Sequence, residues 1–469
     1  MNILEAPGHR RRRARRIRRA LVASAAGGAV LGGVLVVSPW ERESAPPPAP
    51  GPAAQARSAV AAGAPAALSD LAVLVGEQEA RVRARPGDAG AWAVLGTAYV
   101  EQGRRTADAG QYPRAERALR NALKHGARGS RALEGLAALA VARRDFPAAR
   151  KWAEAAREAA PKRWTTQAVL IDAYTGLGDH EAVAKAMDRM TELGSGPAVK
   201  ARAAAVYRDK GWREDAAAQI SDAAAAAEAP AERAAYLEQA GRLALERGDR
   251  EMALRHFEEA LRTDPDLRAA QAGQGRALAA LGRTSEALTA YQAALAKQPR
   301  PDWALELGEL YQSLGLGQAA KVQYDLLRDR VRRAAAAGVD EQLVLGRFEA
   351  DHGDAEAAVR RLRAEWKRQP ATAVADALGW ALYRTGRYEE ALRLATRATE
   401  GEHGGGVRSA LYVFHRGMIE RKLGRYGAAR RHLQEALRID PYFSPLRVPE
   451  AKRALRRLGE PSVEDPPAF

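Results

Sequence analysis

The sequence predicts an all-α fold, a right-handed solenoid of about ten helix–turn–helix repeats. First, residues 234–299 hold the same pattern twice, and matched positions lie 34 residues apart. Second, small residues recur where two packed helices must approach closely, with large apolar residues beside them. Third, only 6% of the 469 residues are aromatic while 46% are hydrophobic, a composition typical of helices packed through small side chains.

Each copy of the pattern reads as two helices separated by a glycine and ended by a proline. Gly248 and Pro265 hold these places in the first copy, and Gly282 and Pro299 hold them in the second. The matched residues are Leu237, Ala240, Gly241, Ala244, Ala253, Phe257 and Ala260 in the first copy, and Gln271, Gln274, Gly275, Leu278, Ala287, Tyr291 and Ala294 in the second. This pattern resembles the tetratricopeptide repeat (TPR). The resemblance implies a scaffold for protein–protein interaction.

The N-terminus reads as a basic head, residues 1–19, followed by an apolar segment, residues 20–40. Eight arginines fall within residues 10–19, and residues 20–37 carry no charge. A helix over residues 20–37 would span about 27 Å, close to the hydrocarbon thickness of about 30 Å. Because arginines stay in the cytoplasm, we expect a single-pass transmembrane or signal-anchor helix that holds the rest of the chain outside the cytoplasmic membrane. The alternative is a cleaved signal peptide, which would give a secreted protein.

The rest of the chain divides into a linker, a capped repeat array and a tail. The Pro/Ala-rich residues 41–66 predict an extended linker. Residues 67–88 predict a lone helix that caps the first repeat. The TPR array then occupies residues 89–445, a C-terminal capping helix residues 446–459, and a short tail residues 460–469.

Repeat spacing is 33 or 34 residues in most places and is longer at a few joins between repeats. Two of these insertions are residues 332–337 and residues 401–406. Loops absorb insertions where a packed helix pair cannot. We therefore expect both insertions in loops.

The sequence shows no catalytic or metal-binding constellation. Cysteine is absent, and the eight histidines are scattered singly. No nucleophile elbow (Gly-x-Ser-x-Gly), phosphate loop with Gly-Lys-Ser/Thr or His-Glu-x-x-His motif occurs. We expect a protein that is not an enzyme and uses no cofactor and no metal. An enzyme with an unrecognised site is the least favoured alternative.

The net charge of +16 at first indicates nucleic-acid binding. Half of it comes from the eight N-terminal arginines, which lie outside the repeats, so nucleic acid is not an expected partner. Arginine outnumbers lysine 63 to 11, a bias that resembles actinobacterial chains from GC-rich genomes. The oligomeric state stays open.

The TPR resemblance places the partner in a concave groove lined by the first helix of each repeat. The predicted groove residues are Arg242, Arg276 and Arg347 in repeats five, six and eight, and Trp380, Tyr383, Arg384, Phe414, Met418, Arg421 and Lys422 in repeats nine and ten. Aromatic groups beside guanidinium groups suit a peptide with acidic and apolar side chains. We therefore expect the C-terminal groove to make the main contact with other proteins or peptides. The alternative is a solvated arginine face with aromatics that pack between repeats.

Overall fold

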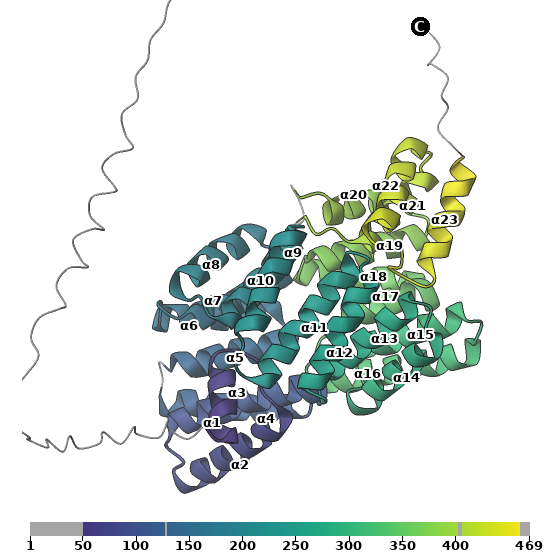
Figure 1. The fold of residues 1–469 in the computed structure, drawn as a ribbon. Coiled ribbons are helices and arrows are strands. Elements are labelled where there is room, and N and C mark those ends of the chain that lie inside the picture. Colours follow the sequence, from purple (N-terminus) through teal and green to yellow (C-terminus); the bar gives the residue numbers. More distant parts are fainter. Residues whose placement is uncertain (1–49, 127–128, 402–405, 460–469) are drawn as a thin grey trace, which may run out of the picture. The chain divides into compact units, whose positions relative to one another are not determined.

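The computed structural model describes residues 50–126, 129–401 and 406–459. Every regular element in these residues is an α-helix, and there are 23 of them (Figure 1). The predicted basic head, apolar segment and tail lie outside the described residues. None of the described helices is both long enough and apolar enough to cross a membrane.

Twenty of these helices, α3 to α22, form ten consecutive hairpins, one for each repeat. Repeats one to five are α3 (Ala89–Thr106) with α4 (Gln111–His125), α5 (Ser130–Ala142) with α6 (Phe146–Ala159), α7 (Trp164–Gly176) with α8 (His180–Leu193), α9 (Pro197–Asp209) with α10 (Arg213–Ala226), and α11 (Pro230–Glu246) with α12 (Arg250–Thr263). Repeats six to ten are α13 (Arg268–Ala280) with α14 (Thr284–Lys297), α15 (Pro301–Ser313) with α16 (Gly317–Ala336), α17 (Gln342–His352) with α18 (Ala355–Arg368), α19 (Thr372–Arg384) with α20 (Tyr388–Thr399), and α21 (Ala410–Lys422) with α22 (Tyr426–Ile439). The predicted fold class, an all-α solenoid of about ten repeats, is confirmed.

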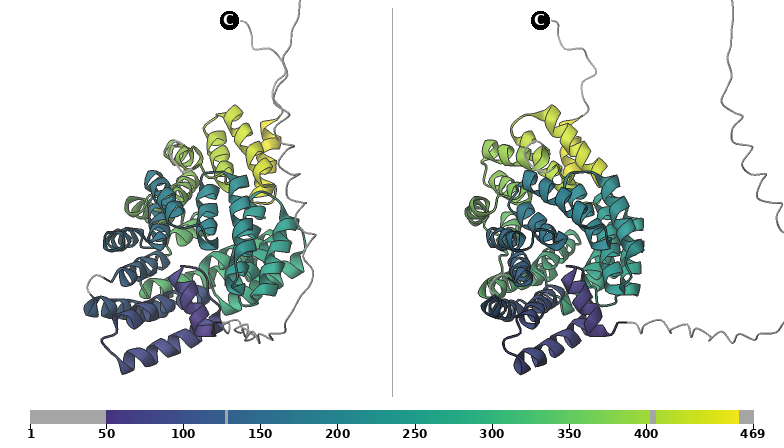
Figure 2. Two further views of the ribbon diagram at one scale, coloured as in Figure 1. Left: turned by 60° about the vertical axis from the view of Figure 1, so that its left-hand side comes forward. Right: turned by 90° about the vertical axis from the view of Figure 1, so that its left-hand side faces the viewer.

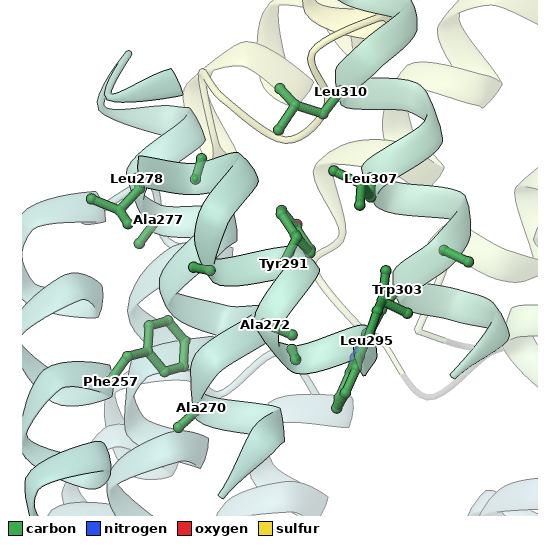
Figure 3. Packing of buried hydrophobic residues seen from close by; sticks show 14 of the residues in the cluster. Phe257, Ala270, Ala272, Ala277, Leu278, Tyr291, Leu295, Trp303, Leu307 and Leu310 are labelled. Carbon is green, nitrogen blue, oxygen red and sulfur yellow. The ribbon is translucent and has the colours of Figure 1, made fainter. Parts of the chain in front are cut away.

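The core of each repeat is a large side chain held against small ones. Phe257 is fully buried, and a Cβ atom added at Gly241 would lie only 2.7 Å from its ring. Figure 3 shows Phe257 with the next large residue of the series, Tyr291, among alanines and leucines of the following helices. The in-register glycines and alanines of the sequence are therefore the places where neighbouring helices receive these rings.

Glycine ends the first helix of most hairpins, as the sequence pattern predicts. Gly248 and Gly282 have φ values of +80° and +77°, a left-handed conformation that other residues adopt only at a cost. An aspartate often follows and caps the second helix. Asp249, for example, accepts a hydrogen bond from the backbone N–H of Met252. These local signals are why the hairpins could be read from the sequence.

Two further helices precede the array and one follows it. They are α1 (Pro52–Ala61), α2 (Leu68–Ala84) and α23 (Arg447–Leu458). The structure differs from the extended linker expected over residues 41–66, because α1 lies inside that range and buries Ala53 and Ala56. Pro52 stands at the start of α1, where proline costs little, and alanines with high helix propensity follow it.

One predicted loop is a helix. The insertion at residues 332–337 extends α16 to Ala336, so that α16 has 20 residues, instead of forming a loop. The inserted run is Arg-Arg followed by four alanines, all good helix formers, so the helix simply continues.

The array winds far enough for later repeats to touch earlier ones. Hydrogen bonds join residues 159 to 225 positions apart, which is about five to seven repeats. Both views of Figure 2 show the blue helices of the early repeats beside green helices of the late ones. We call this line of contact the seam. On one side it consists of the turns within repeats one to five, near residues 104–105, 143–146, 178–180, 211–213 and 248–250, and on the other of the joints between later repeats, near residues 264, 298, 338–341, 369–372, 406–408 and 440–442.

Candidate binding cavity

A cavity of about 1730 Å³ lies on the inner side of repeats one to five. Its wall is formed by the first helices of these repeats, α3, α5, α7, α9 and α11, and mostly by small side chains. The small residues of this wall include Ala93, Thr97, Ala138, Ala168, Thr175, Ala201 and Ala205. Because these side chains are short, they leave space where larger ones would fill the coil.

Segments from other parts of the chain also line the same cavity. Helix α1 borders it with Ala54, Arg57 and Ser58. The end of α16 and the joints of the seam border it from the next winding. The lining residues of these joints are Pro299–Pro301, Ala336, Ala337, Val339, Glu341, Leu343, Ala371–Ala373 and Val407. The cavity therefore depends on the winding of the whole array.

The charged lining of the cavity is predominantly basic. Its basic members are Arg57, Arg104, Arg131, Arg144, Arg163, Arg202, Arg208, Lys210, Arg242, Arg300, Arg330 and Arg333, and its acidic members are Glu101, Asp108, Glu134, Asp172, Asp209 and Glu341. Twelve basic side chains thus face six acidic ones. This surplus favours an anionic ligand.

Most of the lining acids already have an arginine partner within the cavity. Glu134 binds Arg163 through both carboxylate oxygens, at 2.6 and 2.8 Å. Arg104 binds both carboxylate oxygens of Glu101 in the same way. Ion pairs through a single carboxylate oxygen join Arg202 to Asp172, Arg208 to Asp209 and Arg144 to Glu341. By contrast, in the described part of the chain no ion pair joins Arg131, Lys210 or Arg330 to an acid. These three side chains are the ones best placed to meet a ligand's carboxylates.

The acids on this wall are partly removed from water. Burial raises the pKa of Asp172, although the Arg202 and Arg104 guanidinium groups counteract it. Burial also raises the pKa of Glu341, against the opposite effect of Arg144. Charge interactions are stronger where water is excluded, so the arginines of this wall can bind an anion more tightly than arginines on an open surface.

Aromatic side chains add apolar contact area to the cavity. Trp164, Tyr236 and Tyr412 line it together with Tyr112 and Phe146. The Tyr236 hydroxyl donates to Glu232 at 2.6 Å, and burial raises the pKa of this tyrosine. The combination expected of a peptide groove, aromatic groups beside guanidinium groups, is thus present, but in repeats one to five and in the late joints.

Of the ten predicted groove residues, Arg242 alone lines this cavity, where it lies 3.0 Å from Glu238. Arg276 holds the equivalent place in repeat six but pairs with Glu306 of the next repeat, at 2.6 Å. This carboxylate raises the pKa of Arg276. Arg347 is partly buried and does not border the cavity.

The aromatic residues predicted for the C-terminal groove lie in the core, which corrects that expectation. Trp380 is 3% exposed, Tyr383 is buried, and Phe414 and Met418 are almost fully buried. Trp380 donates its ring N–H to Asp351 at 2.8 Å and stacks on Tyr383 and His415, with ring centroids 4.7 and 4.2 Å away. These rings pack between repeats eight, nine and ten, as the alternative reading had it.

Helix α23 completes this burial. Its Arg447 guanidinium lies over the Trp380 ring, 5.3 Å from the centroid, and forms an ion pair with Asp351 at 2.5 Å. The remaining predicted residues surround the core: Arg384 donates to the Ala350 carbonyl, Arg421 is partly buried and Lys422 is exposed. The capping helix therefore occupies the space that a ligand of Trp380 would need.

The lining of repeats one to four has a signal in the sequence. Alanine, threonine, valine and glycine occupy many of their inner positions, and in the structure these short side chains create the space. The contribution of the late joints, such as Glu341 and Thr372, had no local signal, because it arises from the winding of the array.

Comparisons with known proteins agree with the repeat assignment. A family model described as tetratricopeptide repeat matches residues 102–163, 238–300, 272–325 and 377–444. These ranges fall on repeats one, two, five, six, seven, nine and ten. No curated protein matches the chain.

Three solved structures are similar to this chain. The APC/C hetero-tetramer Cut9–Hcn1 is 16% identical, with a TM-score of 0.40 over 79% of this chain and 76% of that chain. A tetratricopeptide repeat protein from Parabacteroides merdae is 17% identical, with a TM-score of 0.34 over 57% of this chain and 100% of that chain. The human IFIT1 dimer with PPP-AAAA is 14% identical, with a TM-score of 0.39 over 75% of this chain and 90% of that chain.

Tetratricopeptide repeats are protein-interaction scaffolds and are generally not enzymes. The matched repeats and the ten observed hairpins, three of them in the unmatched repeats three, four and eight, lead to one conclusion. The chain is an all-α solenoid of ten helical hairpins, and its matched ranges are tetratricopeptide repeats.

Proposed function

We propose that the protein is a scaffold that captures an extended acidic segment of a partner protein in its inner cavity. The observation that carries this proposal is the cavity's excess of basic side chains within walls of small ones. Small-molecule pockets usually measure about 300–1,000 Å³, and this cavity, at about 1730 Å³, is larger. A stretch of polypeptide suits that size better than a metabolite.

The lining defines the chemistry of the captured segment. Carboxylates of the segment would meet Arg131, Arg330 and Lys210, since charge-assisted hydrogen bonds are the stronger ones. Its apolar side chains would pack on Trp164 and Tyr412, which both line the cavity. The alanine walls let a backbone approach the helices closely. An alternating acidic and apolar sequence therefore fits best.

Peptide binding by the full chain tests this proposal. The probe is a fluorescent peptide of alternating Glu and Leu residues, and the control peptide replaces Glu with Lys. Arg131→Glu should weaken binding of the acidic probe about tenfold, a loss of about 1.4 kcal/mol. Lys422→Glu makes the same kind of charge change outside the cavity and should leave binding unchanged. Equal binding of both peptides, or equal losses in both variants, would contradict the proposal.

We further propose that the array acts outside the cytoplasmic membrane, held there by the apolar segment at residues 20–40. The support for this is the sequence alone: a basic head followed by an uncharged run of membrane-spanning length. Release by cleavage, giving a secreted scaffold, is the alternative. The mass of the mature protein distinguishes the two, because cleavage would remove the first residues.

A further inference from the structure

The seam joins five successive turns of the early repeats to joints one winding later. Its first contact is an ion pair between Arg105 and Asp264 at 2.7 Å, in which the side chains are 6% and 10% exposed. Beside it, the Gln298 side-chain amide donates to the Arg104 carbonyl at 3.0 Å. These residues lie in repeat one and in the joints that flank repeat six. The contact is therefore specific and largely shielded from water.

The second contact is a group of backbone and side-chain hydrogen bonds at the turn of repeat two. The Asp340 N–H donates to the Arg143 carbonyl at 2.8 Å, and Arg144 pairs with Glu341 at 2.7 Å. The Gln369 amide also donates to the Arg144 carbonyl, at 3.1 Å. Arg144 and Glu341 both line the cavity. One ion pair is therefore part of the seam and of the cavity wall at once.

The turns of repeats three, four and five reach the seam through glycine. A Cβ atom added at Gly178 would overlap the Pro370 carbonyl oxygen. One added at Gly211 would lie 2.6 Å from the Gly406 oxygen, and one at Gly248 would lie 2.9 Å from Pro441. By contrast, an added Cβ would meet no atom within 4 Å at the equivalent glycines of repeats six, seven, nine and ten, which are Gly282, Gly315, Gly386 and Gly424. Among these turn glycines, only those of the seam lie against another segment of the chain.

The contacts across the seam are mostly polar, whereas those along the array are apolar. Four of the five largest buried apolar clusters run between neighbouring repeats and do not cross the seam. In the remaining one, Val339 and Ala334 join the cluster of repeats one and two. Each repeat of a solenoid is stabilised chiefly by its neighbours. The seam can therefore separate while every hairpin keeps its own core.

We propose that the seam is a reversible closure of the inner cavity, which opens to admit the partner's segment and closes around it. This inference rests on the proposed function for the nature of the ligand. Arg144 couples the two events, because a carboxylate entering the cavity competes with Glu341 for its guanidinium group. A carboxylate bound to Arg144 therefore weakens this contact of the seam.

The absence of cysteine allows a direct test of access. Ala205→Cys places one thiol on the cavity wall. A small maleimide should label it quickly, and a large polyethylene-glycol maleimide slowly, because the large reagent must wait for opening. As a control, Lys422→Cys places a thiol on the exposed surface. If the ratio of the two labelling rates is the same at both positions, the closure is overturned.

Matched glycine variants then connect access to the seam. Gly248→Ala and Gly386→Ala carry the same backbone strain, since both glycines have φ of +80°, but only Gly248 lies in the seam. Gly248→Ala should speed labelling by the large reagent about tenfold, which corresponds to about 1.4 kcal/mol. Gly386→Ala should leave the rate unchanged, and circular dichroism should show both variants folded. Equal labelling rates in the two variants would overturn the proposal. Comparing Gly178→Ala, in the seam, with Gly282→Ala, outside it, repeats the test at a second position.

Peptide association separates this inference from the proposed function. If the acidic probe binds Gly248→Ala faster than Gly386→Ala, the seam gates capture. If the probe binds both at one rate, the gate is refuted while peptide capture stands. If labelling depends on the seam but the probe binds no variant, the closure stands and the proposed ligand is wrong.

Discussion

Repeats one to five and repeats eight to ten are built from the same helical hairpin, but the inner helices border a cavity in the early repeats and a filled core in the late ones. In the early repeats the inner positions hold small residues such as Ala138 and Ala205, and the space in front of them is a cavity. In the late repeats Trp380 and Phe414 are buried, and their rings fill the space between helices. In this solenoid the cavity arises where short side chains leave room, and the aromatic residues that look most like anchors for a ligand stabilise the fold.

The charged residues of the two regions differ in the same way. In the late repeats Asp351 accepts a hydrogen bond from Trp380 and forms an ion pair with Arg447, so its charge is neutralised within the core. Along the cavity, nine of the twelve basic side chains have an acidic partner, and Arg131, Lys210 and Arg330 have none within the described residues. In the late repeats, ion pairs hold the repeats against the capping helix α23. Along the cavity, the basic side chains without an acidic partner are available to a ligand.

The largest predicted effect is the loss of stability on truncating Trp380. Trp380→Ala should destabilise the C-terminal repeats by about 3–5 kcal/mol, because it empties a buried space and leaves Asp351 without its N–H donor. Denaturant unfolding measures the loss. Trp212→Ala, at a tryptophan that is 51% exposed, is the control and should change stability by less than about 1 kcal/mol. A folded, fully stable Trp380→Ala that loses peptide binding would restore the C-terminal groove.

A smaller effect is expected from the buried ion pair of the seam. Removing one partner of a buried pair usually costs about 3–5 kcal/mol, since the other charge stays unpaired and dry. Arg105→Met should cost less than this, because an opened seam lets water reach Asp264. The unfolding free energy that Arg105→Met loses then equals the free energy by which seam closure stabilises the parent protein. If Arg105→Met lowers the unfolding free energy as much as is expected for Trp380→Ala, the seam does not open independently of global unfolding.

The pH dependence of stability should have opposite signs in the two regions. Burial raises the pKa of Asp440, at the last contact of the seam, to about 6, while a hydrogen bond from Tyr442 and the charge of Arg213 act against it and Glu246 adds to it. The folded state then holds this proton more tightly than the unfolded chain. Its contribution is most favourable below the unfolded pKa of about 3.9 and is lost as the pH rises through about 6.

Asp351 is the matched case in the late repeats. Burial alone would raise its pKa, but Arg447 and the Trp380 N–H lower it below the ordinary value. Its contribution is present above the unfolded pKa and is lost as the pH falls. Asp440→Asn keeps an acceptor for the Tyr442 N–H and should remove about 1–2 kcal/mol of pH dependence between about pH 4 and pH 6. Melting temperatures across this range, unchanged by the substitution, would contradict the prediction.

The contrast between the regions also shows how far the sequence could lead. The 34-residue pattern predicted the hairpins because each hairpin packs on sequence neighbours, as Phe257 does on Gly241. Gly178 and Gly282 occupy equivalent places in their turns, yet only Gly178 touches the backbone of another winding. That difference depends on the pitch summed over more than five repeats. The burial of Trp380 likewise depends on α23, which no repeat pattern describes.

The smallest predicted effect compares two arginines at the same repeat position. Arg242 and Arg276 lie 34 residues apart, in repeats five and six; Arg242 lines the cavity, whereas Arg276 is bound by Glu306 outside it. Arg242→Gln removes a partly exposed charge from the wall and should weaken binding of the acidic peptide about fivefold, or about 1 kcal/mol. Arg276→Gln should leave binding unchanged and cost only a little stability, because its ion pair is partly solvated. Fluorescence titration of both variants measures the difference. If Arg276→Gln weakens the peptide as much as Arg242→Gln does, the ligand follows the repeat groove along the whole array and the enclosed cavity is not its site.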